Sequence, residues 1–230
     1  MGGVTAFQRA RSEEQRTVRR QSILQTAATM LDEMPVAALS LNELSRRVGL
    51  AKSNVLRYFE SREAVLLDLL DHAAAELLAE IDEALQSNVD PSAPPHSRAQ
   101  SMASALATSF ATHPMLCELL SAQAGVLERN VSIEVATRYK QGARDSLVGL
   151  ATLLQRLLPE LKEERSARAA SMIIILVGAL WTHSHPAPAV LAAYDADPSL
   201  AFMHVPFAEA LEQTVATFLV GMLIEGAHTP

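Results

Sequence analysis

The chain has 230 residues, of which 49% are hydrophobic and 20% are charged, and its formal net charge is −7. This length and composition suit two helical domains with a sizeable core. The single cysteine, Cys117, excludes an intrachain disulfide and fits a reducing cytoplasm. The N-terminus is polar and charged, unlike a signal peptide, and the longest apolar run, Ala169 to Trp181, is shorter than the about 20 residues that a membrane helix needs. We therefore expect a cytoplasmic protein without a membrane segment.

The first predicted helix follows a basic run between Arg16 and Arg20 and stops before Pro35, which disfavours helix at the residue preceding it. Its apolar residues recur at helical spacing and form one buried face; they are Ile23, Ala27, Ala28 and Leu31. The residues from Met1 to about Arg11 show no clear helix signal. They are interpreted as a flexible end, either an arm that binds phosphates or the minor groove, or a disordered tail.

Two short helices joined by a glycine turn are predicted between Ser40 and Arg62. Ser40 followed three residues later by Glu43 indicates a capping box, in which each side chain bonds a backbone N–H of the other residue. Gly49 ends the first helix because a left-handed backbone costs least at glycine. The inward stripe of this helix is Leu41, Leu44 and Val48, and its outward residues, which face solvent or phosphate, are Asn42, Ser45, Arg46 and Arg47.

In the second helix of the pair, Val55 and Phe59 stand four residues apart and are expected to pack against the first. This turns a short, polar and basic set outward, namely Ser53, Asn54 and Arg57. Such residues suit base edges, because Asn pairs with adenine, Arg with guanine and a hydroxyl with either. The residues toward the two ends of this helix are expected to bind phosphates and fix the register; they are Lys52, Tyr58 and Arg62.

This stretch resembles the tetracycline-repressor (TetR) family of bacterial transcription regulators, because the helix pair closes with Tyr58-Phe59 and then Ser61-Arg62-Glu63. The resemblance covers roughly the first 65 residues. It implies an all-α fold, with an N-terminal three-helix helix-turn-helix DNA-binding domain at residues 1–63 and a C-terminal helical effector-binding and dimerisation domain at residues 64–230. It implies Lys52, Ser53, Asn54 and Arg57 for the groove and Tyr58 and Arg62 for the DNA backbone, and Arg46 joins them from the outward face of the first helix.

Two positions depart from the common pattern of the family. Ala51 stands where many relatives carry a Ser that caps the recognition helix, so a hydroxyl cap worth about 1 kcal/mol is missing. Leu56 stands where many carry a Tyr, and a leucine there can touch a thymine methyl but cannot donate to a phosphate. Two alternatives stay open: a solvated helix pair of an unrelated helical protein, and a helical interaction adaptor that has lost DNA binding.

Charge is divided unevenly along the chain. Residues 1–63 carry ten Lys/Arg and seven Asp/Glu, a net of +3, whereas residues 64–230 carry nine and nineteen, a net of −10. Because the larger part repels DNA, only the N-terminal end is expected to face the duplex.

Helical spacing continues downstream, and strand signals are scarce. A long helix is predicted at about residues 62–86, followed by a Pro- and Ser-rich loop at 88–97. Further helices are predicted at about 98–112, 114–129, 132–157, 163–184 and 207–226, with a partly irregular connection from Pro186 to Pro206.

The resemblance implies that two helices, at about 167–183 and 207–224, form a four-helix interface with a second copy of the chain. Both are unusually apolar, which fits a homodimer, and a core within one chain is the alternative. A dimer recognises a pseudo-palindromic operator in double-stranded DNA with its two recognition helices. A small molecule between the helices of the second domain would release the DNA by stabilising an arrangement that no longer matches the operator. The predicted function is therefore a ligand-responsive repressor.

The effector pocket is the least specified part of the sequence. Large apolar residues with a few polar tips are candidate lining residues, although each is more often ordinary core; they are Met102, Phe110, Met115, Tyr139, Leu150, Trp181 and His185. The expected effector is a small apolar or amphipathic molecule that the sequence does not identify. His183 and His185 do not share a helix face, so neither a metal site nor a cofactor is expected.

An enzyme is the remaining alternative class. The sequence contains no nucleophile elbow, phosphate loop, His-Glu-x-x-His or Cys-x-x-Cys motif, and Cys117 lies among apolar residues. No catalytic residue is therefore predicted.

Overall fold

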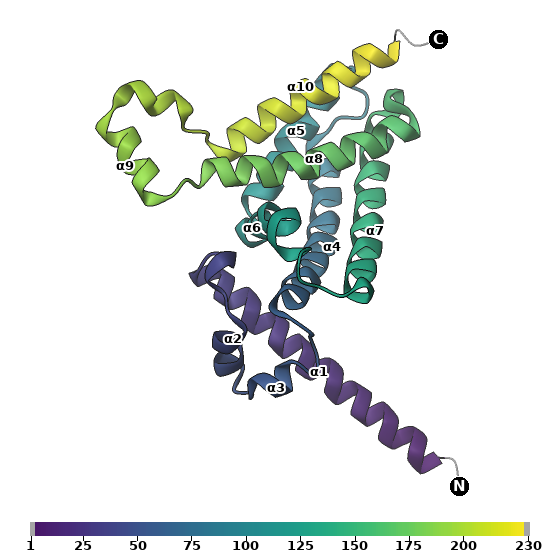
Figure 1. Cartoon of the computed structure of the whole chain (residues 1–230). Helices are drawn as coiled ribbons and strands as arrows, with labels where there is room; N and C mark the ends of the chain where they lie inside the picture. Colours follow the sequence, from purple (N-terminus) through teal and green to yellow (C-terminus); the bar gives the residue numbers. More distant parts are fainter. Residues whose placement is uncertain (1–2, 228–230) are drawn as a thin grey trace. The chain divides into compact units, whose positions relative to one another are not determined.

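The computed structural model describes the backbone of residues 3–227 and the side chains of residues 13–225. All regular elements in this range are helical, which confirms the expected all-α fold (Figure 1). In chain order they are α1 (Gly3–Glu33), η1 (Val36–Ala38), α2 (Leu41–Val48), α3 (Lys52–Val55), α4 (Arg62–Asn88), α5 (Pro95–Ala111), α6 (Pro114–Ala122), η2 (Gln123–Leu127), α7 (Ile133–Leu157), η3 (Pro159–Leu161), α8 (Lys162–Ser184), α9 (Pro188–Ala196), η4 (Pro198–Met203) and α10 (Phe207–Ala227). The elements η1, η3 and η4 are 3-10 helices, and η2 is a π-helix.

The chain folds as two compact units. The first comprises the residues up to Leu69 together with residues 123–136, and the second comprises residues 70–122 and those from 137 onward. α4 and α7 each begin in the first unit and continue into the second. The boundary therefore lies inside α4, later than the expected division after Glu63, and a distant segment of the chain completes the first unit.

α1 ends at Glu33, before Pro35, as the sequence predicts. It begins at Gly3, so helix occupies most of the stretch that was expected to be a flexible end. Met1 and Gly2 lie outside the described residues, as do the side chains of residues 3–12. No proline or glycine interrupts the chain between Gly3 and Glu33, which allows one continuous helix.

The core of the first unit is built from α1, α2, the turn after α3 and the start of α4. Its buried side chains include Ile23, Ala27, Met30, Leu39, Leu44, Val55, Phe59, Val65 and Leu66. Leu41 and Val48 of the expected inward stripe are half-buried, whereas Leu44 is fully buried. The expected outward position of Ser45 is wrong, because this residue is buried and its hydroxyl donates to the Leu41 carbonyl at 2.6 Å.

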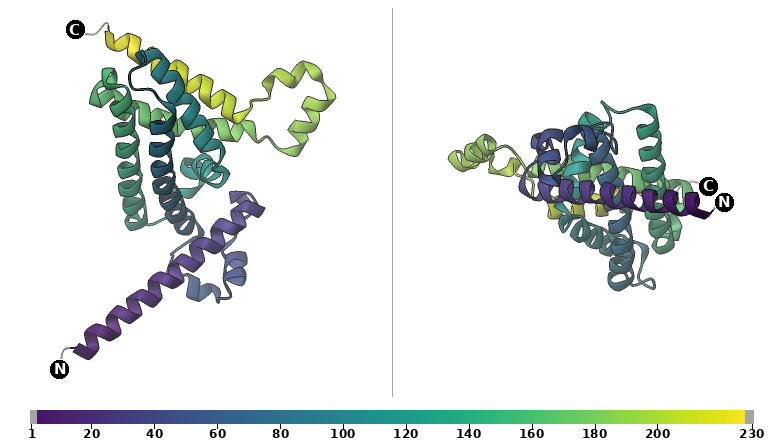
Figure 2. Two further views of the ribbon diagram at one scale, coloured as in Figure 1. Left: turned by 180° about the vertical axis from the view of Figure 1, so that it is seen from behind. Right: turned by 90° about the horizontal axis from the view of Figure 1, so that it is seen from below.

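In the second unit α10 packs along α5 and α8, and α6 packs against α8 (Figures 1 and 2). These helices bury long apolar side chains between them, among them Met102, Leu106, Phe110, Ile173, Val177, Leu211, Val215 and Leu219. Arg98 of α5 is also buried, and its guanidinium binds the carbonyls of Leu157 and Ala93 and the Glu160 carboxylate. This arginine joins the start of α5 to the end of α7.

α7 approaches the second-unit part of α4 closely at a glycine. A Cβ placed on Gly149 would lie 2.3 Å from Leu78 Cδ2, so the missing side chain makes room for Leu78. Further along, Arg156 Nη2 lies 2.5 Å from Asp82 Oδ1. The two long helices are therefore held together by close packing and by an ion pair.

The connection between α8 and α10 contains α9 and η4, where a partly irregular segment was expected. Pro188 and Pro198 stand at the first positions of these two elements, where the fixed φ of proline favours helix. One helix was expected at 114–129. Instead, the α-helix α6 ends at Ala122, and the π-helix η2 follows it directly.

Two helical segments, Pro159–Ser184 and Phe207–Glu225, are long and apolar enough to cross a membrane by length and composition, with mean hydropathies of 1.3 and 1.4. The interrupted apolar run in the sequence did not indicate this. Within the described residues only 39% and 28% of these windows is buried, so α8 and α10 keep exposed apolar surface. Packing of these helices against other core helices explains part of their apolar character, and exposed apolar surface of this kind is typical of interaction sites.

Candidate nucleic-acid interface

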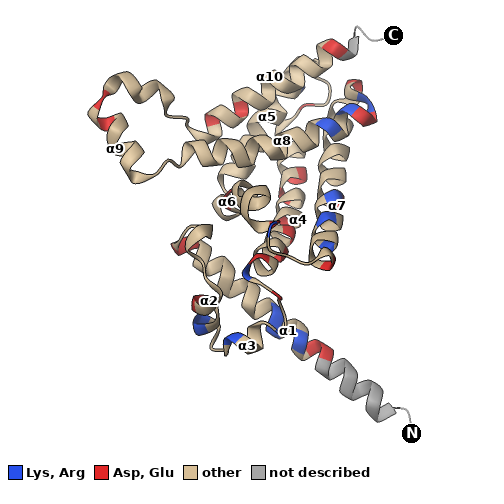
Figure 3. Cartoon of the chain, viewed as in Figure 1, with Lys and Arg blue, Asp and Glu red and all other residues tan. Residues whose placement is uncertain are grey.

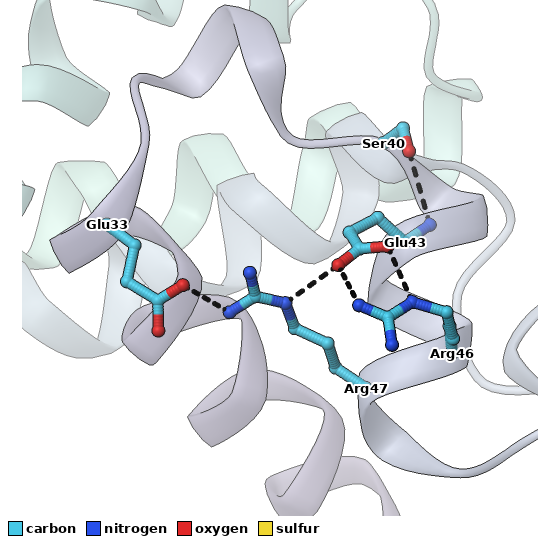
Figure 4. A network of polar contacts seen from close by, with 5 residues as sticks. All are labelled: Glu33, Ser40, Glu43, Arg46 and Arg47. Carbon is cyan, nitrogen blue, oxygen red and sulfur yellow. Dashed lines mark hydrogen bonds and ion pairs between the residues drawn. The ribbon is translucent and has the colours of Figure 1, made fainter.

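A side-chain cap at its start and a left-handed glycine at its end fix α2. The Ser40 hydroxyl accepts a hydrogen bond from the Glu43 N–H at 3.2 Å, and Gly49 adopts φ = 72° at the C-terminal end. Only half of the expected capping box is present among the described residues, because the Glu43 carboxylate binds two arginines instead (Figure 4). The start and end of α2 were therefore predicted correctly, and the partner of Glu43 was not.

Glu43 is the centre of a charged network. It accepts hydrogen bonds from Arg46 Nε at 2.9 Å and from Arg47 Nε at 3.0 Å, and Arg47 Nη1 also reaches Glu33 at 2.6 Å (Figure 4). The bonds from Arg46, and then those from Arg47, lower the pKa of the Glu43 carboxyl to about 2. Arg47 ties α2 to the end of α1, whereas the Arg46 side chain stays 72% exposed on the outer face.

The predicted recognition helix is shorter than expected. α3 has four residues, and Ala51 at its N-cap makes no side-chain hydrogen bond. Beyond Val55 the chain continues in tight turns, in which the Arg57 N–H bonds the Asn54 carbonyl and the Tyr58 N–H bonds the Val55 carbonyl. The N-terminal donors of α3 therefore have no side-chain acceptor at the N-cap.

The side chains of this segment alternate as the sequence predicts. Val55 and Phe59 are buried, and the outward residues Lys52, Ser53, Asn54, Leu56 and Arg57 are exposed. Tyr58 is half-buried. The polar groups that can meet base edges and phosphates therefore share one surface, and the apolar groups anchor it.

Arg20 of α1 holds the end of this segment. Its guanidinium lies 4.3 Å from the centre of the Phe59 ring, Nη1 donates to the Tyr58 carbonyl at 3.3 Å, and Nη2 lies 2.6 Å from Asp68 Oδ1. One arginine thus joins α1, the recognition segment and α4. The sequence indicated only that Arg20 belongs to a basic run.

The other arginines of that run line a surface groove. Its wall from α1 includes Arg16, Arg19 and Ser22, and the opposite wall includes Asn54, Arg57 and Tyr58; Glu14, Gln15, Val18 and Leu50 complete it. Figure 3 shows basic residues on α1, α2 and α3 at this part of the first unit. Arg16 and Arg19 were not predicted to belong to the interface, although their spacing of three residues places them on one helix face.

Arg62 has a different position from the one expected of a phosphate ligand. Its Nη1 donates to the Leu39 carbonyl at 3.0 Å and its Nε to Glu63 at 3.2 Å, and the side chain is 21% exposed. Arg62 therefore braces the start of α4 against the turn before α2. Its guanidinium is engaged inside the first unit.

The seven candidate ligand residues are distributed over four helices of the chain. Met102 and Phe110 of α5 are fully buried in the core, Tyr139 and Leu150 of α7 are buried, and Met115 of α6 is half-buried. Only Trp181 and His185 are brought into a ring contact, with stacked centroids 3.9 Å apart.

The contact between Trp181 and His185 belongs to a larger cluster. Phe207 meets the Trp181 ring edge-on at 5.0 Å, and Trp181 Nε1 donates to Glu118 at 3.0 Å. His185 Nδ1 lies 3.0 Å from the Trp181 carbonyl. No group of three side chains suited to a metal ion occurs among the described residues. Phe207 and Glu118 were not among the predicted residues, because only the fold brings them to Trp181.

Cys117 is buried, and its thiol donates to the Phe110 carbonyl at 3.3 Å. Burial raises the pKa of this thiol to about 12. The thiol is therefore protonated at neutral pH and packs as an apolar group, which suits a structural position.

Two family descriptions match the chain. "Tetracyclin repressor-like, C-terminal domain" matches residues 69–226, and "Bacterial regulatory proteins, tetR family" matches residues 23–69. The chain is also 38% identical over 66 residues to the HTH-type transcriptional regulator EthR of Mycobacterium tuberculosis (strain ATCC 25618 / H37Rv). This match spans 29% of the chain and 29% of the length of EthR.

Solved structures resemble the chain over most of its length. A possible TetR family transcriptional regulator from Streptomyces coelicolor A3(2) superposes with a TM-score of 0.56 and 17% identity, covering 90% of this chain and 99% of that one. The regulator FadR from Bacillus subtilis, solved in complex with stearoyl-CoA, superposes with a TM-score of 0.51 and 15% identity, covering 88% and 98%. At these identities the likeness establishes a shared fold.

Proposed function

We propose that this chain, which belongs to the tetR family of bacterial regulatory proteins, is a cytoplasmic DNA-binding transcription regulator that acts as a ligand-responsive repressor. One observation carries the proposal: Asn54 and Arg57 are exposed on a segment that Val55 and Phe59 anchor in the core and whose end is held by Arg20. A rigid support for exposed amide and guanidinium groups is what recognition of base edges requires.

Within this proposal Asn54 and Arg57 contact bases. Ser53 adds a hydroxyl that bonds a base edge, and Leu56 contacts a thymine methyl group. Lys52 and Tyr58 bind phosphates and fix the register, and Arg46 joins them only when its guanidinium leaves Glu43. Arg16 and Arg19 join the phosphate-binding set, because they line the same groove as Asn54 and Arg57. Arg62 becomes a positioning residue, because its guanidinium is bound to Leu39 and Glu63.

The DNA-bound form is a homodimer on a pseudo-palindromic operator, since two recognition segments related by a two-fold axis meet two half-sites. The proposed interface consists of α8 and α10, near residues 167–183 and 207–224. The exposed apolar surface of both helices supports this choice, with Ile175 60% and Ile224 58% exposed.

The effector to which the repressor responds is a small apolar or amphipathic molecule. Met102, Phe110, Met115, Tyr139, Leu150, Trp181 and His185 stay candidates for its site. A route for the response exists inside the first unit, where the Glu60 carboxylate accepts the Ser132 N–H at 2.6 Å. The Ser132 hydroxyl also accepts the Val135 N–H and so caps the start of α7. A displacement of the start of α7 therefore moves the hydrogen-bond partner of Glu60, the residue that follows the recognition segment.

Binding to DNA upstream of the gene, measured by fluorescence anisotropy at several salt concentrations, tests this function. We expect specific binding that weakens as salt rises. Asn54→Ala and Arg57→Ala should relax sequence preference, and Lys52→Ala should weaken binding to all sequences evenly. Arg138→Ala, an exposed arginine of α7, is the matched control and should change neither.

Two outcomes would contradict the proposal. Equal effects of the base-contacting and phosphate-contacting variants would refute the division of roles. Absence of binding at low salt would refute DNA recognition and favour the adaptor alternative.

A further inference from the structure

The segment between α8 and α10 forms a helical hairpin, which we name the α9 hairpin and define as residues 186–206. α9 and η4 contact each other in it, and Figures 1 and 2 show it extending beyond the ends of α8 and α10. The Asp197 carboxylate accepts the Ser199 N–H at 2.9 Å, and the Tyr194 ring meets His204 edge-on with centroids 6.3 Å apart. The hairpin is therefore organised by contacts of its own.

An aromatic cluster closes the base of the hairpin. Trp181 comes from the last turns of α8, His185 directly follows α8, and Phe207 is the first residue of α10. Because His185 stacks on Trp181 and Phe207 packs against its edge, the two ends of the hairpin are held together. A segment ordered in this way loses little conformational entropy when it meets a partner.

The described part of the chain, residues 13–225, does not cover the hairpin. Neither α9 nor η4 contains a buried residue. α9 has nine residues, and isolated helices shorter than about 12–15 residues are marginal in water. The packing surface that stabilises α9 is therefore expected on another molecule.

Four exposed side chains of the hairpin are large and apolar. Phe202 is 83% exposed and Met203 is 51% exposed, and Val190 and Leu191 are exposed by 40% and 42%. Of the twelve exposed large hydrophobic side chains in the described part of the chain, seven lie on α8, the α9 hairpin or α10. The hairpin thus continues, along the chain, the apolar surface of the two helices assigned to the dimer.

The charged residues of this part of the chain indicate which kind of partner the α9 hairpin binds. Residues 169–230 contain no Lys or Arg and five Asp or Glu, and Figure 3 shows α9 with acidic residues only. Anionic lipid surfaces and nucleic acids repel such a segment, because both attract proteins through basic residues. An apolar protein surface with few charges is the complementary partner, and the α8 and α10 surface of a second copy has this character.

We propose that the α9 hairpin is a dimerisation arm that packs on α8 and α10 of a second copy of this chain, with Phe202 and Met203 as its main contacts. The inference rests on the proposed function for the use of α8 and α10 as the interface. In a two-fold dimer each copy contributes one arm, so both arms exchange at the same time.

The first test compares two double variants by sedimentation equilibrium of the full chain. Phe202→Asp/Met203→Asp should raise the dimer dissociation constant at least about a hundredfold, because each of the two arms loses about tenfold. Ile133→Asp/Val148→Asp changes two exposed apolar residues of α7, 82% and 59% exposed, and should alter the constant by no more than about twofold. Circular dichroism checks that both variants keep their helix content.

The second test requires no disruptive substitution. A photoreactive benzoylphenylalanine replaces Phe202, and labelled and unlabelled copies of the chain are mixed before irradiation. Cross-links between differently labelled copies that map to α8 or α10 are the expected result. Cross-links within one copy only, an unchanged dissociation constant of the Phe202→Asp/Met203→Asp variant, or capture of the chain by phosphatidylglycerol vesicles would overturn the proposal.

The two proposals fail in distinguishable ways. A dimer that depends on Phe202 and Met203 but binds no DNA would support the dimerisation arm and refute the proposal that the chain is a DNA-binding regulator. A dimer that binds DNA specifically and tolerates the Phe202→Asp/Met203→Asp change would refute the arm alone.

Discussion

Replacing Arg20 by alanine tests whether this residue, rather than its neighbour, supports the recognition segment. The Arg20 and Asp68 side chains are 30% and 10% exposed. Breaking a fully buried pair costs about 3–5 kcal/mol and an exposed pair contributes about 0–1 kcal/mol, so this partly buried pair should contribute about 2 kcal/mol. The contact with the Phe59 ring adds about 0.5–1 kcal/mol. The expected loss of stability in the first unit is therefore about 2.5–3 kcal/mol.

Arg19→Ala is the matched control, because Arg19 is exposed and lines the groove. It should change stability by less than about 0.5 kcal/mol while weakening DNA binding and reducing the salt slope by about 1.8, because each copy of the dimer loses one phosphate contact. Urea unfolding followed by circular dichroism measures the stability, and amide hydrogen exchange of residues 54–59 measures local opening. Equal losses of stability in both variants, or faster exchange in Arg19→Ala than in Arg20→Ala, would refute the assignment.

Three further predictions concern single residues. The pKa of Glu43 is lowered from 4.5 to about 2, so its ionised carboxylate stabilises the fold above pH 4.5 and this stabilisation should be lost as the pH falls toward 2. Urea unfolding at several pH values should therefore show that the free energy of unfolding falls less on acidification in Glu43→Gln than in the parent chain. Gly49→Ala places a Cβ at φ = 72° and should destabilise the first unit by about 1 kcal/mol, with a smaller loss for Gly49→Asn in the same assay. Cys117, whose pKa is raised to about 12 by burial, should resist iodoacetamide at pH 8 in the folded chain and react after unfolding; rapid labelling of the folded protein would contradict its burial.

Local features were predictable where the chain itself supplies both partners. The Ser40 cap and the left-handed Gly49 lie within a few residues of the groups they serve, so the limits of α2 follow from the sequence. Glu43 shows where this reasoning ends. Its expected partner, the Ser40 N–H, competes with the two charged arginines of the next turn, and a charge-assisted bond is the stronger one.

Prolines were the main source of error in the second unit. Between α8 and α10 they were interpreted as marks of irregular structure, yet Pro188 starts α9 and Pro198 starts η4. Proline is compatible with the first helical position because no intrahelical partner is needed there. The flanking residues, rather than the proline alone, decide between a helix start and a loop.

The roles of the arginines were not predictable, because the partner of each lies far along the chain. Arg20 meets Asp68, Arg47 meets Glu33, and Arg62 meets the Leu39 carbonyl. In the sequence these residues are equivalent members of a basic domain.

This division of the arginines limits the electrostatic part of DNA binding. Among the described side chains four cations of the first unit's DNA-facing surface make no hydrogen bond or ion pair within the chain; they are Arg16, Arg19, Lys52 and Arg57. Arg57 is assigned to base edges, so if the other three each neutralise one phosphate in both copies of a dimer, about six counterions are released, and the slope of log K against log salt should be no steeper than about −5.4. A steeper slope would mean that Arg46 leaves Glu43, or that residues before Ser12 also reach the duplex. Adding Arg46→Ala would separate the two explanations, because it lowers the slope only in the first case.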